Sequence, residues 1–238
     1  MDDFKRFVGQ IPPVTRYFCG FTLLLSFCMT YKILGPELLI LDFSLAFGKF
    51  QIWRLITTFF FVGPFSMSFL FGMMMVYYSV SSIEAYFDKR QADLGVMLVF
   101  NALAVMFVAF LANNFYVLQS PYIFSLIYVW SKFVPDQQMS IWGFPVQSLH
   151  LPWVLMGFHL FTGGDPFNDL IGVAAGHCYV YLKEVLPDSH GYDLLKTPKL
   201  MQIIVDKLNG VHGIPANQRN AGRVNFMNND GAQANLGA

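Results

Sequence analysis

The sequence predicts an all-α membrane protein built from six transmembrane helices, and three observations support this prediction. Of the 238 residues, 55% are hydrophobic and only 13% are charged, with a mean hydropathy of +0.48, whereas soluble domains carry about 25% charged residues. The apolar residues gather in long runs. The Lys and Arg residues are distributed unevenly among the segments between these runs. A chain with so little polar surface is expected to have the bilayer as its solvent.

Six apolar runs are the candidate spans. They cover residues 17–34, 67–83, 94–112, 121–134, 151–164 and 168–186. A span needs about 20 residues to cross about 30 Å of hydrocarbon, whereas the fourth and fifth runs, of about 14 residues, reach only about 21 Å. If these two runs are soluble-type core helices, the count falls to four. Ahead of the second span, the segment interrupted by Gly63-Pro64 is expected to be a loop that dips into the membrane interface.

The basic residues predict the orientation of the chain. With six spans, 12 of the 15 Lys and Arg residues fall on the side that holds both termini, and Lys32, Lys49 and Arg54 fall on the other side. Because cytosolic loops are enriched in Lys and Arg, both termini are expected in the cytosol. The loop "FDKRQAD" after the second span supports the same orientation.

The C-terminal part changes character after residue 190, so that residues 1–190 form the predicted transmembrane domain. Residues 191–209 contain an amphipathic helix, with Thr197 as a plausible N-cap and Pro198 at its first position. It is expected to lie in the cytosolic interface or to dock on the bundle. Residues 210–238, rich in Asn and Gly, are expected to form a disordered cytosolic tail.

Several kinds of site find no support in the sequence. The net charge of zero gives no nucleic-acid footprint, and the five histidines and three cysteines lack the spacing of metal ligands. We therefore expect neither a cofactor nor a metal. An intramembrane protease needs an activated nucleophile, but no serine is followed by glycine, and Ser120 and Ser125 in "LQSPYIFSLIY" read as helix-start and packing residues.

Five segments taken together carry a family resemblance. They are "QIWRLITTFFFVGPFSMSFLFG", "YYSVSSIEAYFDKRQAD", "SPYIFSLIYVWSK", "LPWVLMGFHLFTGGDPFNDLIGVAAGH" and "LLKTPKL". In this order, over about residues 5 to 202, the chain resembles the derlins, which are rhomboid pseudoproteases of the endoplasmic reticulum. The resemblance implies a six-helix rhomboid-like bundle without a catalytic dyad. The base histidine of active rhomboids lies three residues before the first packing glycine, and the matching residue here is Asp169.

The resemblance and the residues together give six motif positions. The Trp-Arg motif falls on Trp53 and Arg54, at the lumenal boundary, where an interfacial anchor or a clamp on the lumenal loop is expected. Glu84 is expected to bond loop backbone groups or a nearby cation. Gly172 and Gly176 are expected to pack the sixth helix tightly on a neighbour, with His177 as a packed or hydrogen-bonding residue rather than a substrate contact.

The polar residues Asn101, Asn113, Asn114 and Ser125 are the candidates for a substrate groove, because they interrupt apolar segments. A groove beside short spans, which thin the bilayer, would lower the cost of moving a polypeptide across it. As in derlins, the expected function is retrotranslocation of misfolded client proteins from the endoplasmic reticulum to the cytosol.

The resemblance also implies partners, namely a membrane ubiquitin-ligase complex and, in many derlins, an AAA ATPase. Because the tail segment "NFMNNDGAQANLG" fits the ATPase-binding box poorly, only an indirect link is expected, and the oligomeric state stays open. Two other classes remain as alternatives. One is a serine protease with an unrecognised dyad around Ser125, and the other is a small-solute transporter, although no matched interrupted helices are seen.

Overall fold

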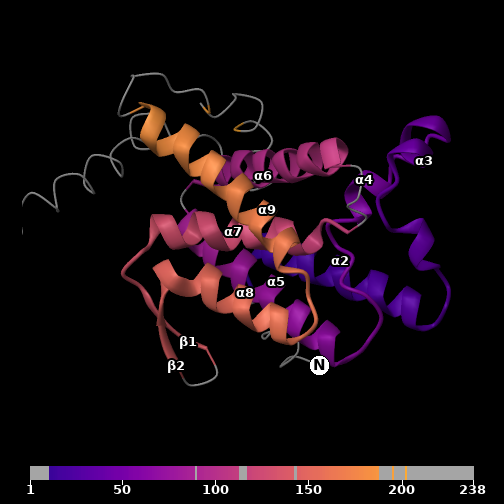
Figure 1. The fold of residues 1–238 in the computed structure, drawn as a ribbon, viewed down its shortest axis with the longest axis horizontal. Coiled ribbons are helices and arrows are strands. Elements are labelled where there is room, and N and C mark those ends of the chain that lie inside the picture. Colours follow the sequence, from indigo (N-terminus) through magenta and orange to yellow (C-terminus); the bar gives the residue numbers. More distant parts are fainter. Residues whose placement is uncertain are drawn as a thin grey trace, which may run out of the picture.

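The computed structural model describes residues 11–88, 90–112, 117–141 and 144–187, together with residues 195 and 202. The described part is a bundle of six longer helices with short elements between them (Figure 1). The longer helices are α2 (Pro13–Thr30), α5 (Met67–Tyr86), α6 (Gln91–Ala112), α7 (Gln119–Phe133), α8 (Leu151–Phe161) and α9 (Pro166–Val180). Each of the six overlaps one of the six apolar runs of the sequence.

Short elements join these helices. They are the 3-10 turn η1 (Pro36–Leu38), α3 (Phe43–Gly48), α4 (Arg54–Thr57), β1 (Gln138–Ile141), β2 (Phe144–Gln147), the 3-10 turn η2 (Ser148–His150) and the π-helical turn η3 (Tyr181–Val185). The antiparallel hairpin of β1 and β2 is absent from the all-α prediction. Its strands have four residues each, which is at the lower limit of the length over which alternation indicates a strand.

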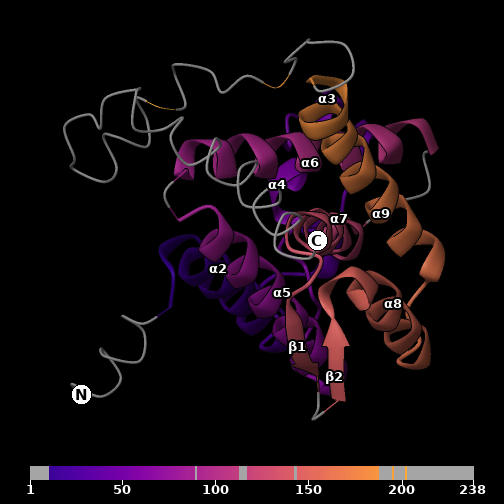
Figure 2. The same ribbon diagram turned by 90° about the vertical axis from the view of Figure 1, so that its left-hand side faces the viewer.

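Helix α7 is the centre of the bundle. Figure 2 shows it end-on, with the other long helices arranged around it. All residues from Pro121 to Ser131 are buried, and a helix that is apolar on every side is stable only inside a protein or a membrane. Helix α7, with only 15 residues, is therefore enclosed by protein.

The lengths of the helices bear on the membrane prediction. Within the described residues, α6 is the one helix with a segment long and apolar enough to span a membrane by itself, at Gln91–Leu111 with a mean hydropathy of 2.5. Helices α7 and α8 have 15 and 11 residues, or about 22 and 17 Å at 1.5 Å per residue. The count of six spans thus depends on the sequence pattern and is not given by helix length.

The turn between α8 and α9 is built from local signals. Gly163 follows α8 with φ +86°, a left-handed conformation that glycine adopts without strain. Asp165 then caps α9 by accepting a hydrogen bond from the Phe167 N–H at 3.0 Å, and Pro166 occupies the first helical position. These signals bring the end of α8 next to the start of α9.

Several predicted features lie outside the described residues. They are the amphipathic helix at 191–209, of which only residues 195 and 202 are described, the tail at 210–238, and the groove candidates Asn113 and Asn114.

Candidate functional site

Arg54 holds the segment that follows α2. The side chain is buried, at the start of α4. Its Nε donates to Oε1 of Gln51 at 2.6 Å, and its Nη1 donates to the carbonyl of Ile40 at 3.0 Å and to that of Glu37. A guanidinium is always charged, so in a buried place it needs acceptors. Here the acceptors are the Gln51 side chain and the carbonyls of Glu37 and Ile40, so that Arg54 clamps the segment after α2.

Trp53 and Thr57 extend the same contact. The Trp53 Nε1–H donates to the carbonyl of Leu38 at 3.3 Å, and the Thr57 hydroxyl donates to the carbonyl of Leu39 at 3.1 Å. The Trp53 side chain stays 50% exposed. The Trp-Arg pair therefore holds the backbone of residues 37–40 in place and leaves the Trp53 indole ring on the surface.

Glu84 caps a helix that is distant in the sequence. Its two carboxylate oxygens accept hydrogen bonds from the backbone N–H of Val14 at 2.8 Å and of Thr15 at 2.7 Å, and from the Thr15 hydroxyl at 2.8 Å. The N-cap residue of α2, Pro12, makes no side-chain capping bond, so Glu84 satisfies N–H groups that would otherwise have no partner. Its negative charge also faces the positive end of the α2 dipole. The sequence left the partner of Glu84 open.

Gly172 and Gly176 lie where α9 meets α7. A Cβ on Gly172 would overlap the carbonyl of Pro121 and lie 2.9 Å from Cβ of Phe124, and one on Gly176 would lie 2.6 Å from the carbonyl oxygen of Ser125. The two backbones thus approach in the way that a Gly-x-x-x-Gly pair permits. Both glycines are buried.

The two described groove candidates are enclosed. Asn101 is fully buried on α6 and donates from Nδ2 to the carbonyl of Met97 at 2.9 Å, while its Oδ1 has no partner. Ser125 is also fully buried, and its hydroxyl donates to the carbonyl of Tyr122 in its own helix at 2.6 Å. Neither side chain lines an open groove in this structure, because the close packing around α7 covers both.

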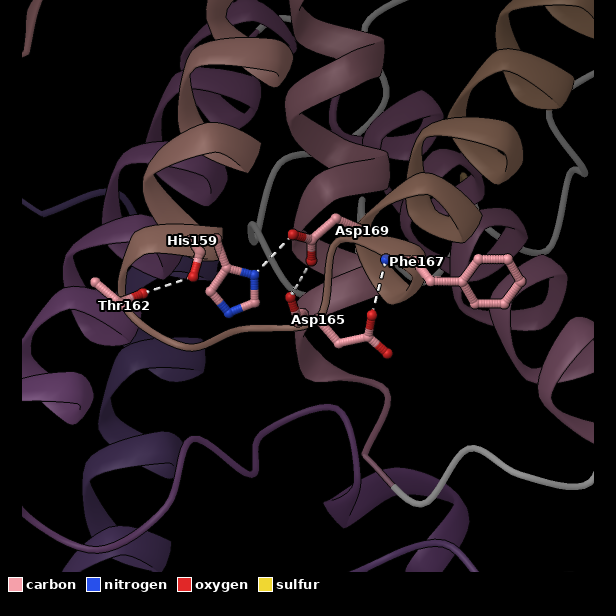
Figure 3. Close-up of polar contacts among 6 residues, drawn as sticks. His159, Thr162, Asp165, Phe167 and Asp169 are labelled. Carbon is pink, nitrogen blue, oxygen red and sulfur yellow. Dashed lines mark hydrogen bonds and ion pairs between the residues drawn. The ribbon is translucent and has the colours of Figure 1, made fainter.

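A polar cluster joins α7, α8 and α9 at the end where α7 and α9 begin. The Asp169 carboxyl is 0% exposed. Its Oδ1 accepts a hydrogen bond from the Ser120 hydroxyl at 2.7 Å, and its Oδ2 lies 2.7 Å from Nδ1 of His159, which is 26% exposed. Figure 3 shows the His159 ring and the Asp169 carboxyl facing each other across the turn between α8 and α9. Each carboxylate oxygen therefore has a donor from a different helix.

This arrangement differs from that of a serine protease. A protease needs a serine hydroxyl bonded to a histidine, with the carboxylate behind the histidine. Here the carboxylate lies between the two other groups, and the Ser120 hydroxyl donates to Asp169. Among the described residues no hydrogen bond joins Ser120 or Ser125 to a histidine, and no group of three or more His, Cys, Asp or Glu side chains could hold a metal.

His159 is the member of the cluster that the sequence did not single out. His159 lies 10 residues before Asp169 in the sequence, and Ser120 lies 49 residues before Asp169. No local motif therefore contains all three residues. A Cβ on Gly164 would overlap the His159 ring, which shows how closely the turn covers the imidazole. The juxtaposition depends on the packing of three helices, and no signal in the sequence could have located it.

His177 lies on α9 next to Gly176 and is exposed. Its Nδ1 is 2.8 Å from the hydroxyl of Tyr128 on α7, and the two rings meet edge to face with centroids 5.8 Å apart. The side chain is thus a hydrogen-bonding partner of the central helix.

Comparison with known proteins identifies the family of this chain. Residues 11–199 match the Der1-like family. The chain is 37% identical to Derlin-1.1 of Zea mays, with 84% of each chain covered. It is 31% identical to Derlin-1 of Caenorhabditis elegans, with 92% of this chain and 91% of the relative covered. It is also 33% identical to Derlin-1 of Homo sapiens, covering 100% of this chain and 97% of the relative. The chain therefore belongs to the Der1-like, or derlin, family.

Proposed function

We propose that this protein is a non-catalytic factor of endoplasmic-reticulum-associated degradation that eases the retrotranslocation of misfolded proteins from the lumen to the cytosol. The observation that carries the proposal is the place of Asp169, which in the resemblance to rhomboids matches the position of the base histidine. A buried carboxylate with both oxygens occupied holds helices together and leaves the neighbouring hydroxyl without a histidine base.

The proposed mechanism uses the short helices. With six spans and both termini in the cytosol, α7 and α8 are too short to cross about 30 Å of hydrocarbon. Because α7 is enclosed by protein, the bilayer becomes thinner beside α8, of which only the first turn is buried. A thinner bilayer lowers the free energy for moving the polar backbone of a client across it. The Arg54 contacts support this by holding irregular backbone at the lumenal boundary, with the exposed Trp53 ring as an interfacial anchor.

The proposed partners are misfolded clients, the lipid bilayer and a membrane ubiquitin-ligase complex, with an indirect link to an AAA ATPase. The groove that a client would use is not assigned to Asn101 or Ser125, since both are buried.

A degradation chase tests the proposed function. In cells without derlins, reintroducing this protein should restore the turnover of a misfolded lumenal client, and Arg54→Ala should fail to restore it. Lys49→Gln is the matched control, because Lys49 is a neighbouring exposed cation. If the wild-type protein leaves the half-life of the client unchanged, the proposal is wrong.

The protease alternative has a separate test. A fluorophosphonate probe reacts with a serine that an adjacent base activates. Purified protein, with Ser120→Ala and Ser125→Ala as controls, should show no labelling that depends on either hydroxyl. Labelling that Ser120→Ala or Ser125→Ala abolishes would contradict the non-catalytic assignment.

A further inference from the structure

The surface around Tyr128 is a second polar site, distant from the Asp169 cluster. Tyr128, on the latter part of α7, contacts one side chain of its own helix and one on the latter part of α9. The Tyr128 hydroxyl contacts Nδ1 of His177 at 2.8 Å, and the Lys132 Nζ lies 5.3 Å from the centroid of the Tyr128 ring. Tyr128 is 8% exposed, whereas His177 and Lys132 are both exposed. The tyrosine is thus the buried support of two exposed nitrogen groups.

The hydrogen bond to Tyr128 bears on which nitrogen of His177 carries the hydrogen. Either group could donate in this contact, and we assign the Tyr128 O–H as the donor to Nδ1, because a phenol is the stronger acid and an imidazole nitrogen the stronger base. In a neutral imidazole the second nitrogen then carries the hydrogen. Nε2–H of His177 is therefore a donor, and it has no hydrogen-bond partner in the described part of the chain.

Lys132 adds a positive charge to the same place. Within the described residues it forms no ion pair, and its ammonium carries three N–H donors and no acceptor. The site consequently offers donors from two helices, one of them charged, with no carboxylate bonded to either. Such a set fits an anionic oxygen ligand.

The neighbouring surface of α9 is apolar. Leu170 and Ala174 on α9, and Tyr181 at the start of η3, are exposed at spacings of three or four residues along with His177. Residues at these spacings share one face of a helix. Figure 1 shows α9 diverging from α8 as both leave the turn that joins them. A polar donor in the middle of an exposed apolar stripe indicates a ligand with both a polar and an apolar part.

Depth in the proposed membrane makes the ligand more definite. His177 lies 11 residues after Pro166, or about 16 Å along α9, and Lys132 lies in the last turn of a helix that is only 15 residues long. A lysine alone can extend to the headgroups, but His177 is held in place by Tyr128. Its N–H therefore needs an acceptor at its own level, since an unpaired donor in hydrocarbon costs several kcal/mol.

We propose that Lys132 and Nε2–H of His177, positioned by Tyr128, bind the phosphate of a phospholipid of the cytosolic leaflet, whose acyl chain lies along the apolar stripe of α9. The site draws this headgroup inward to the end of α7. This inference rests on the proposed membrane topology and deepens the proposed thinning of the bilayer. The expected ligand chemistry is the phosphodiester that common phospholipids share, so binding does not require a net negative headgroup.

Photolabelling of purified protein tests the site. The full chain is reconstituted in nanodiscs of phosphatidylcholine that contain a phosphatidylcholine probe with a diazirine on its acyl chain, and labelled peptides are identified by mass spectrometry. The double variant K132Q/H177Q should lose labelling of α9 by about tenfold, because it removes two donors, one of them charged. Tyr128→Phe should give an intermediate loss, since the imidazole is no longer oriented.

Lys183→Gln is the matched control, because Lys183 is a cation on the same part of the chain that donates to the carbonyl of Leu195 at 3.0 Å. It should leave the labelling of α9 unchanged. Unchanged thermal unfolding of K132Q/H177Q shows that the variant is folded, as expected for two exposed side chains.

Three outcomes would overturn the inference. They are labelling of K132Q/H177Q at the wild-type level, labelling that requires phosphatidylserine in the nanodisc, and displacement of the probe by inorganic phosphate alone. Labelling of this site in microsomes by a client polypeptide in place of lipid would also reassign it. Because the measurement uses no client, its failure leaves the degradation chase of the proposed function unaffected.

Discussion

Helices α8 and α9 both pack against α7, but they are attached in different ways. Along α9, residues from Asp169 to Tyr179 are buried at regular intervals, and the two glycines bring its backbone against that of α7. Along α8, only Leu151 and Pro152, at its first turn, are buried. At its other end, a hydrogen bond joins His159 to Asp169.

This difference in attachment indicates how freely each of the two helices can move. Backbone contact adds dispersion energy at every turn, so α9 is fixed along its length. A hydrogen bond to a charged group contributes about 1.5–3 kcal/mol at one point, so α8 is fixed at its ends. We expect α8 to be the more mobile of the two helices, and His159 to decide its position.

The largest effect is expected where the backbones meet. Gly172→Leu places a side chain against the carbonyl of Pro121 and should separate α9 from α7, with a loss of about 3 kcal/mol or more in the free energy of unfolding. Gly157→Leu, on α8, is the control, because a Cβ there would have no atom within 4 Å. Thermal unfolding in detergent measures both variants. Equal melting temperatures for the two would show that the glycine contact does not hold α9.

The second effect concerns the polar contact of α8. His159→Ala leaves the buried Asp169 carboxylate with Ser120 as its remaining described donor, at an expected cost of about 2 kcal/mol. Hydrogen exchange should quicken in the latter half of α8 and stay unchanged in α7. His159→Asn retains an N–H donor and should restore part of the protection. A uniform increase in exchange across α7, α8 and α9 would mean that His159 supports the whole bundle and not α8 alone.

A smaller effect is expected from the turn that covers the imidazole. Gly164→Ala adds a methyl group that overlaps the His159 ring, and the ring must move while its Nδ1 is bonded to Asp169. The expected loss is about 1 kcal/mol, again with faster exchange in α8. Gly157→Ala serves as the control, and an effect of Gly164→Ala no larger than that of this control would contradict the arrangement.

The smallest effect is expected at the N-terminus of the short helix α3. Asp42 caps α3, and the pKa of its carboxyl is lowered by the Ser44 hydroxyl and then by the Leu45 N–H, which donate to it at 2.6 and 3.0 Å. Since the folded-state pKa is depressed, this contribution is present above the ordinary Asp pKa and is lost as the pH falls through the folded value.

Hydrogen exchange of α3 between pH 7 and pH 3 measures this effect. Exchange in α3 should quicken, relative to intrinsic rates, only at the acid end, while the α7–α9 contact is unaffected. In Asp42→Asn this acid dependence should disappear. If α3 opens with the same pH profile in both proteins, the cap is not its source.

The sequence by itself determined where the long helices lie, because apolar runs, proline starts and glycine turns act within a few residues. It also singled out the Trp-Arg pair, Glu84, the two glycines and His177, and it indicated that two of the six apolar runs are short. The derlin family was recognisable from the order of these segments, and the comparisons confirm it.

Only the tertiary structure decided which groups meet. The carbonyl partners of Arg54, the capping of α2 by Glu84 and the meeting of Ser120, His159 and Asp169 each join residues on different elements. The burial of Asn101 and Ser125 inside the bundle is of the same kind. The physical reason is that a hydrogen bond acts over about 3 Å, so it depends on how helices pack, which no local pattern of residues specifies.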